Sequence, residues 1–186
     1  MEGERNGMVE TREEFLNRAL AEYESPLIGY ALGFLHDADK ARDVVQDTFI
    51  RLYQQDMAKV SAGLKTWLFT VCRNRALDIL RKEKRLVALK EEKMERISAD
   101  IADPLEEADW EERGRQLRRA LDRLNDNQRE VIRLKFEQNL SYKEISEITG
   151  LSTGNVGFLL HVGLKKLRGF LPDDLLSNEH PRTYQS

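Results

Sequence analysis

The sequence predicts an all-α protein, with two small helical domains joined by an acidic linker. Apolar residues recur at helical spacing along most of the chain, and few runs alternate as a half-buried strand would. Only four of the 186 residues are prolines, and 34% of the residues are charged. An acid-rich stretch divides the chain into halves, each long enough to bury only a modest core.

Composition and periodicity place the expected boundaries. The linker is rich in acids, poor in aromatic residues and contains Pro104, which argues against a core of its own. We expect a flexible N-terminus over 1–10, a first domain over 11–88, the acidic linker over 89–112, a second domain over 113–172 and a C-terminal tail over 173–186.

The first domain is expected to contain four helices. The first begins at Thr11 and ends at Ser25-Pro26, where a second begins because proline suits the first turn of a helix. A third helix spans roughly 38–55, a loop follows over 56–63, and a long fourth helix spans roughly 64–85.

The second domain holds the most informative stretch. Ser141, followed three residues later by Glu144, forms a capping box and predicts the start of a helix. Gly150 stands where that helix must stop and the chain must turn, a position that favours a residue tolerant of positive φ. Ser152 can cap a second helix that continues through Arg168. This is a helix-turn-helix pattern, which typically reads the DNA major groove; a plain helical hairpin is the alternative.

The net charge of −3 conceals two basic blocks. Residues 65–90 carry eight Lys or Arg against two Asp or Glu, and residues 113–172 carry twelve against six. The acidic block between them, residues 91–112, carries two against ten. Because local charge decides whether a surface attracts phosphate, two faces of this chain are candidates for nucleic-acid binding.

Several functional classes are not indicated by the residues present. One cysteine, Cys72, and three scattered histidines predict neither a disulfide framework nor a metal site, and no cofactor is expected. No nucleophile–base set or phosphate-binding loop appears, so we do not expect an enzyme. The chain shows no signal peptide and no run that would insert into a membrane, so a cytoplasmic location is expected.

Three blocks in this order resemble the bacterial RNA polymerase sigma factors of the extracytoplasmic function (ECF) group. The block at 38–49 has an acid, a glutamine, another acid and a phenylalanine. The block at 66–81 has Trp-Leu, then Arg-Asn, an aspartate and a basic run. The block at 121–168 includes the helix-turn-helix. The resemblance covers most of residues 12–170 and implies a four-helix region 2 domain and a helix-turn-helix region 4 domain.

The resemblance implies a transcription initiation factor. Such a protein binds core RNA polymerase, directs it to promoters by recognising −10 and −35 elements, and assists DNA melting. The implied partners are core polymerase, promoter DNA and an anti-sigma factor. Two alternatives remain: a stand-alone helix-turn-helix regulator, which would not need the basic helix at 64–85, and a helical adaptor, against which the two basic blocks count.

The resemblance also assigns residues to three sites. The polymerase-binding residues would be Asp39, Asp43, Gln46 and Asp47. The −10 side would use Lys65, Trp67, Arg73, Asn74, Arg75, Arg81, Lys82 and Arg85. The −35 side would use Arg129, Lys143, Thr153, Asn155, Phe158, His161, Lys165 and Lys166.

Some of these positions have a second interpretation. Trp67 is either a core residue, which its apolar neighbours favour, or a wedge at the edge of melted DNA. Phe49 is expected in the core, and the loop at 56–63 is expected to form part of a pocket for an extruded base. The helix face formed by Asp43, Gln46 and Asp47 has a second interpretation as an ordinary solvent-exposed surface that binds no partner.

The second helix of the helix-turn-helix departs from the family pattern. Gly157, Phe158 and Leu159 stand where lysine, serine and arginine are usual, and Val162 stands where a basic residue is common. We therefore expect weak −35 binding by the isolated second domain. Phe158 and Leu159 would contact either thymine methyl groups or a partner protein.

Overall fold

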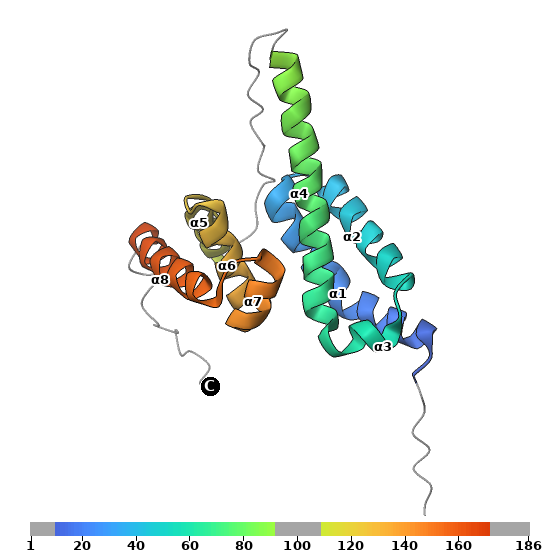
Figure 1. Ribbon diagram of the computed structural model, residues 1–186. Coiled ribbons are helices and arrows are strands. Elements are labelled where there is room, and N and C mark those ends of the chain that lie inside the picture. The colour runs from blue at the N-terminus through green and yellow to red at the C-terminus, as the bar shows by residue number, and fades with distance from the viewer. Residues whose placement is uncertain (1–9, 92–108, 172–186) are drawn as a thin grey trace, which may run out of the picture. The chain divides into compact units, whose positions relative to one another are not determined.

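The computed structural model describes residues 10–91 and 109–171, and these fold into two compact units (Figure 1). Every regular element in these ranges is a helix, and no strand occurs within them. The predicted all-α class is therefore confirmed. Across the same two ranges, no helix is both long and apolar enough to cross a bilayer.

The first unit is organised around three long helices. Helices α1, α2 and α4 pack against one another, and their shared core includes the fully buried Phe15, Leu27, Val44, Leu68 and Phe69. The elements of this unit are α1 (Arg12–Leu35), α2 (Ala38–Tyr53), α3 (Met57–Val60), the 3-10 helix η1 (Ser61–Gly63) and α4 (Leu64–Glu91).

The expected break at Ser25-Pro26 was wrong, because α1 continues through Pro26. A proline inside a helix costs about 3 kcal/mol. Two large side chains beyond it, those of Leu27 and Tyr30, are almost completely buried, and each such burial contributes about 1.5–3 kcal/mol. An unbroken helix keeps them on the same buried face as Phe15, so packing offsets the local penalty.

The segment expected as a loop at 56–63 is also helical. The carboxylate of Asp56 caps α3 by accepting a hydrogen bond from the backbone N–H of Ala58, at 3.1 Å. Val60 is buried and anchors the segment to the unit, and η1 leads directly into α4. An aspartate cap and a single apolar anchor are thus enough to order this short connection.

Helix α4 is longer than the sequence indicated, ending at Glu91 instead of near residue 85 (Figure 1). The second unit begins with α5 (Asp109–Asp122). The predicted linker, 89–112, is therefore helical at both ends, and its interior lies outside the described residues. The flexible N-terminus and the C-terminal tail expected from the sequence lie outside them too, apart from Glu10.

The second unit continues with α6 (Asp126–Phe136), α7 (Tyr142–Thr149) and α8 (Thr153–Phe170). Helices α6 and α8 approach closely at Gly163, where an added Cβ would lie only 2.9 Å from Cδ1 of Ile132. A small residue at this position is what allows the two helices to pack so tightly.

The predicted turn between α7 and α8 is confirmed in detail. Ser141 and Glu144 form both hydrogen bonds of the capping box. Gly150 ends α7 with a φ of 76°, in the left-handed region, and Ser152 accepts a hydrogen bond from the backbone N–H of Asn155 at 3.2 Å. The hydroxyl of Ser146 donates to the carbonyl of Leu151 at 2.6 Å, which fixes the turn further.

Candidate functional site

An exposed polar stripe runs along α2. Asp37 caps this helix by accepting hydrogen bonds from two backbone N–H groups in its first turn. Asp39, Asp43 and Gln46 are exposed, and their spacing places them along one face of the helix. Asp39 pairs with Arg42 at 2.8 Å. Three of the four residues assigned to polymerase binding thus share one solvent-facing surface.

Asp47, the fourth residue assigned to polymerase binding, faces α4. Its Oδ2 accepts a hydrogen bond from Nε of Arg75 at 2.8 Å, and both side chains are partly exposed. The sequence assigned these two residues to different partners, but the structure pairs them with each other.

An apolar groove lies between α1 and α2 beside the polar stripe. Its volume is about 420 Å³. Ile50 and Tyr53 in its wall are 56% and 61% exposed, and Phe49 is half-buried there and not in the closed core that the sequence suggested. Gln46 belongs to both the groove and the stripe. The lining residues are Leu16, Leu20, Glu24, Ile28, Arg42, Val45, Gln46, Phe49, Ile50 and Tyr53.

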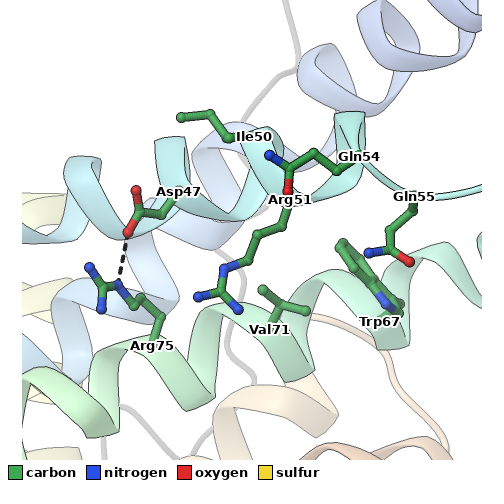
Figure 2. Close-up of a pocket in the computed structure, with 8 residues that line it drawn as sticks. All are labelled: Asp47, Ile50, Arg51, Gln54, Gln55, Trp67, Val71 and Arg75. Carbon is green, nitrogen blue, oxygen red and sulfur yellow. Dashed lines mark hydrogen bonds and ion pairs between the residues drawn. The ribbon is translucent and has the colours of Figure 1, made fainter.

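A second, polar pocket lies between α2 and α4 (Figure 2). Its volume is about 610 Å³, and it combines two guanidinium groups, two amides and the indole of Trp67. Trp67 is half-buried, so one part of its ring system contributes to the pocket wall. The lining residues are Asp47, Ile50, Arg51, Gln54, Gln55, Trp67, Val71 and Arg75.

Sequence reasoning missed Arg51, Gln54 and Gln55 in this pocket. The segment at 56–63, expected to form part of a pocket for an extruded base, contributes no residue to the lining of this cavity, and that expectation stays a prediction. Helical periodicity shows that Arg51 is off the buried face, but only the packing of α2 on α4 brings it opposite Trp67.

The other residues assigned to the −10 side lie along α4 and differ in exposure. Asn74, Arg81, Lys82 and Arg85 are exposed, whereas Lys65 and Arg73 are half-buried. Arg81 pairs with Asp78 at 3.0 Å, an exposed contact of small energetic value.

An ion pair between Lys40 of α2 and Glu83 joins α2 to the basic part of α4. Nζ of Lys40 lies 2.7 Å from Glu83, and this hydrogen bond is the main reason that the pKa of Lys40 is raised. Glu83 is one of only two acids within residues 65–90, and Lys40 engages it. Because Lys40 offsets the negative charge of Glu83, this carboxylate does not reduce the net positive charge of the surface around residues 65–90.

An exposed stripe of side chains runs along α8. Asn155, Phe158, His161 and Lys165 are exposed and follow one another at intervals of three or four residues, which places them in one stripe. Val156, Leu160, Gly163 and Leu167 are buried on the opposite side. Thr153, the first residue of α8, is also exposed, and Leu159 is half-buried. We call Asn155, Phe158, His161 and Lys165 the α8 stripe.

Other residues assigned to the −35 side differ in their surroundings. Lys143 is exposed in the first turn of α7, and Nζ of Lys166 lies 3.4 Å from Oε1 of Gln128. Arg129 is only 17% exposed and is held by Asp122 at 3.1 Å and Asp126 at 2.6 Å. Its charge is offset within the unit, which makes it a weaker candidate for phosphate binding than the sequence suggested.

The single cysteine lies in the core of the first unit. Cys72 is fully buried, and burial raises the pKa of its thiol to about 12. Within residues 10–91 and 109–171, no cluster of three or more His, Cys, Asp or Glu is positioned to hold a metal ion.

Comparisons with known proteins match both units. The Sigma-70 region 2 family matches residues 20–86, and the Sigma-70 region 4 family matches residues 114–167. The chain is 31% identical over 151 residues to the ECF RNA polymerase sigma factor SigW of Bacillus subtilis, covering 76% of this chain and 79% of SigW. It is 27% identical over 169 residues to the RNA polymerase sigma factor SigV of the same organism, covering 90% and 98%.

A solved structure agrees with these matches. The sigma factor RpoE of Bartonella quintana, crystallised with the anti-sigma factor NepR, superimposes with a TM-score of 0.63 at 25% identity, covering 90% of this chain and 99% of that one. Two sigma-70 regions in this order define a transcription initiation factor, which directs RNA polymerase to promoters. The chain belongs to the extracytoplasmic function group of RNA polymerase sigma factors. The stand-alone regulator is accordingly not favoured.

Proposed function

We propose that three surfaces divide the steps of initiation between them. The stripe formed by Asp39, Asp43 and Gln46 on α2 binds core RNA polymerase. The basic face of α4 and the polar pocket beside it bind the −10 element and the melted strand. The α8 stripe binds the −35 element.

The exposure of the α2 stripe supports its role in binding polymerase. Asp43 and Gln46 are exposed to solvent, so a partner can reach them without rearranging the unit. A carboxylate that meets an arginine across an interface forms a charge-assisted hydrogen bond, roughly twice as strong as a neutral one. The aliphatic and aromatic walls of the neighbouring groove can add apolar contact to the same interface.

The polar pocket between α2 and α4 is the observation that carries the −10 assignment. Trp67 offers an aromatic surface for stacking, while Arg51 and Arg75 place positive charge at the rim (Figure 2). Unstacking a base costs a few kcal/mol, and stacking on an aromatic side chain returns about 1–3 kcal/mol. This pocket therefore lowers the free energy of the melted state relative to the duplex.

The two DNA-binding surfaces work together because both belong to one chain held by polymerase. Binding of the second element becomes intramolecular once the first is engaged, so the combined affinity exceeds that of either surface alone. The α8 stripe, with a single cation, needs this help most. The chain acts by binding, without catalysis of its own, and it acts in the cytoplasm, where polymerase and chromosome are present.

An anti-sigma factor is a further proposed partner. The RpoE structure was solved with the anti-sigma factor NepR. In this chain, the groove between α1 and α2 exposes Leu20, Ile50 and Tyr53 beside the α2 stripe. A protein segment that fills this groove would cover Gln46 and compete with polymerase.

Open-complex formation by holoenzyme tests the −10 assignment. Holoenzymes containing the wild-type chain, Trp67→Ala or Trp67→Phe are compared at saturating promoter DNA, with permanganate reactivity of unpaired thymines as the readout. We expect Trp67→Ala to reduce melting by about 5- to 150-fold, the equivalent of one lost stack, and Trp67→Phe to retain most of it. Core-polymerase affinity is measured in parallel and should be unchanged. Equal melting by Trp67→Ala and wild-type holoenzymes would contradict the assignment.

A further inference from the structure

We propose that Phe158 on α8 reads thymine in the −35 element through the 5-methyl group of the base. This inference rests on the proposed −35 role of the α8 stripe and specifies the chemistry by which that stripe selects a sequence. Selection would then depend on apolar contact in the major groove, supported by an amide at Asn155.

The position of Phe158 is the first support. Phe158 is 63% exposed, at the centre of a helix face whose opposite side is buried. Ser152 caps the helix, and the contact between Gly163 and Ile132 holds it close to α6. In a helix-turn-helix, the N-terminal part of the second helix contacts base edges, and Phe158 lies within the first two turns of α8.

The chemistry of the neighbouring residues is the second support. Residues 153–164 contain no lysine and no arginine, so the bidentate arginine contact that commonly selects guanine is not available from this half of the helix. The first cation, Lys165, lies about two turns beyond Phe158. An asparagine side chain suits the N6 and N7 edge of adenine, and an apolar side chain suits the thymine methyl. Asn155 and Phe158, one turn apart, therefore favour an A·T-containing element.

Tyr142 widens the apolar surface. An added Cβ at Gly157 would lie 3.4 Å from Cε2 of Tyr142, so the tyrosine ring rests against the helix next to Phe158. Tyr142 is itself 46% exposed. The Tyr142 ring thus packs against the backbone of α8 at Gly157.

The charge around the aromatic surface points to DNA as the occupant and not to an apolar protein segment. Nζ of Lys135 lies 5.8 Å from the centroid of the Tyr142 ring, and Lys143 is exposed one residue further along. Lys165 continues the stripe at its other end. Aromatic groups flanked by cations match a groove in which base methyl groups lie between two phosphate backbones.

Deoxyuridine substitution tests the contact one methyl group at a time. The promoter is first identified by transcription from random fragments with holoenzyme. Each −35 thymine is then replaced by deoxyuridine, which removes only the 5-methyl group, and holoenzyme affinity is measured with the wild-type chain and with Phe158→Ala. We expect at least one substitution to weaken wild-type binding about fourfold, the effect of one buried methyl-sized group. Phe158→Ala should bind the thymine promoter more weakly and lose this difference.

Phe136→Ala is the matched control, because Phe136 is an equally exposed phenylalanine of the same unit, at 61%. It should keep the full thymine-to-uracil difference, and Phe158→Leu should keep part of it. The inference is overturned if the −35 element contains no thymine, if no substitution weakens wild-type binding, or if Phe158→Ala retains the full difference. Each of these results leaves promoter-specific transcription intact, whereas failure of the wild-type chain to direct transcription would overturn the proposed function itself.

Discussion

Asp47 on α2 and Arg75 on α4 form an ion pair across the wall of the polar pocket, with Nε of Arg75 2.8 Å from Oδ2 of Asp47 (Figure 2). The pair connects α2, which carries the stripe that we propose binds polymerase, to α4, which carries the surface that we propose binds DNA. This hydrogen bond to Nε orients the guanidinium of Arg75. Asp47 thus moderates the positive charge of the pocket.

Removal of this carboxylate should strengthen binding to single-stranded DNA. Asp47→Asn leaves Arg75 uncompensated, so we expect higher affinity and a salt dependence steeper by about 0.7 for one added phosphate contact. Fluorescence titration of holoenzyme with labelled single strands at several salt concentrations measures both. Glu13→Gln makes the same charge change at an exposed position of α1, outside the surfaces proposed to bind polymerase or DNA, and should have a smaller effect. An equal gain in the two variants would indicate a general charge effect and contradict the role given to Asp47.

A larger residue at Gly163 should destabilise the second unit, and a smaller residue at Ile132 should rescue it. Gly163→Ala places a Cβ 2.9 Å from Cδ1 of Ile132, so a cost of about 1–3 kcal/mol is expected. Ile132→Val removes that same Cδ1 atom, at a cost of about 0.5–1.5 kcal/mol when made alone. Urea unfolding followed by circular dichroism measures the free energy of unfolding. The double variant should lose less of this free energy than the two single variants lose together. Strictly additive costs would show that the close contact does not limit packing.

The turn between α7 and α8 should depend on glycine at position 150. Gly150 has a φ of 76°, and an L-residue in this left-handed conformation costs about 1–2 kcal/mol, so Gly150→Ala should lower the free energy of unfolding by that amount. Gly154→Ala is the control, because Gly154 is helical and faces open space. There alanine should raise stability by about 0.5–1 kcal/mol. Similar values for the two variants, measured by denaturant unfolding, would contradict the strained-turn interpretation.

The thiol of Cys72 should be unreactive in the folded protein. Burial raises its pKa to about 12, so the thiol is neutral at pH 7–8 and also inaccessible to reagents. Ellman's reagent should therefore give no colour with the native chain and one equivalent after unfolding in urea. Rapid labelling under native conditions would show that α1 and α4 separate around this residue.

Local rules explain which parts of the fold the sequence could predict. The capping box at Ser141, the glycine at 150 and the cap at Ser152 are signals carried by a few neighbouring residues, and the structure confirms each of them. The break expected at Pro26 failed because tertiary burial of Leu27 and Tyr30 outweighs the penalty of an internal proline. The rule that proline ends a helix considers one residue only, so it does not include the energy of a core formed by segments far apart in the sequence.

Some features of the candidate site could likewise be predicted from local sequence, and others could not. The exposure of Asp43 and Gln46 follows from helical periodicity, and so does the α8 stripe. The pairing of Asp47 with Arg75, and the entry of Arg51 into the pocket beside Trp67, depend on how α2 packs against α4. That packing joins residues far apart in sequence, so no local pattern could reveal it.

Run-off transcription with purified core RNA polymerase tests the central claim most directly. Random genomic fragments are transcribed with and without the chain, and with a variant in which Asp43 and Gln46 are both alanine. We expect discrete new start sites that appear only with the wild-type chain, because the α2 stripe must bind polymerase for the promoter surfaces to act. The absence of new start sites, with DNA binding by the chain intact, would contradict this account and favour a stand-alone regulator.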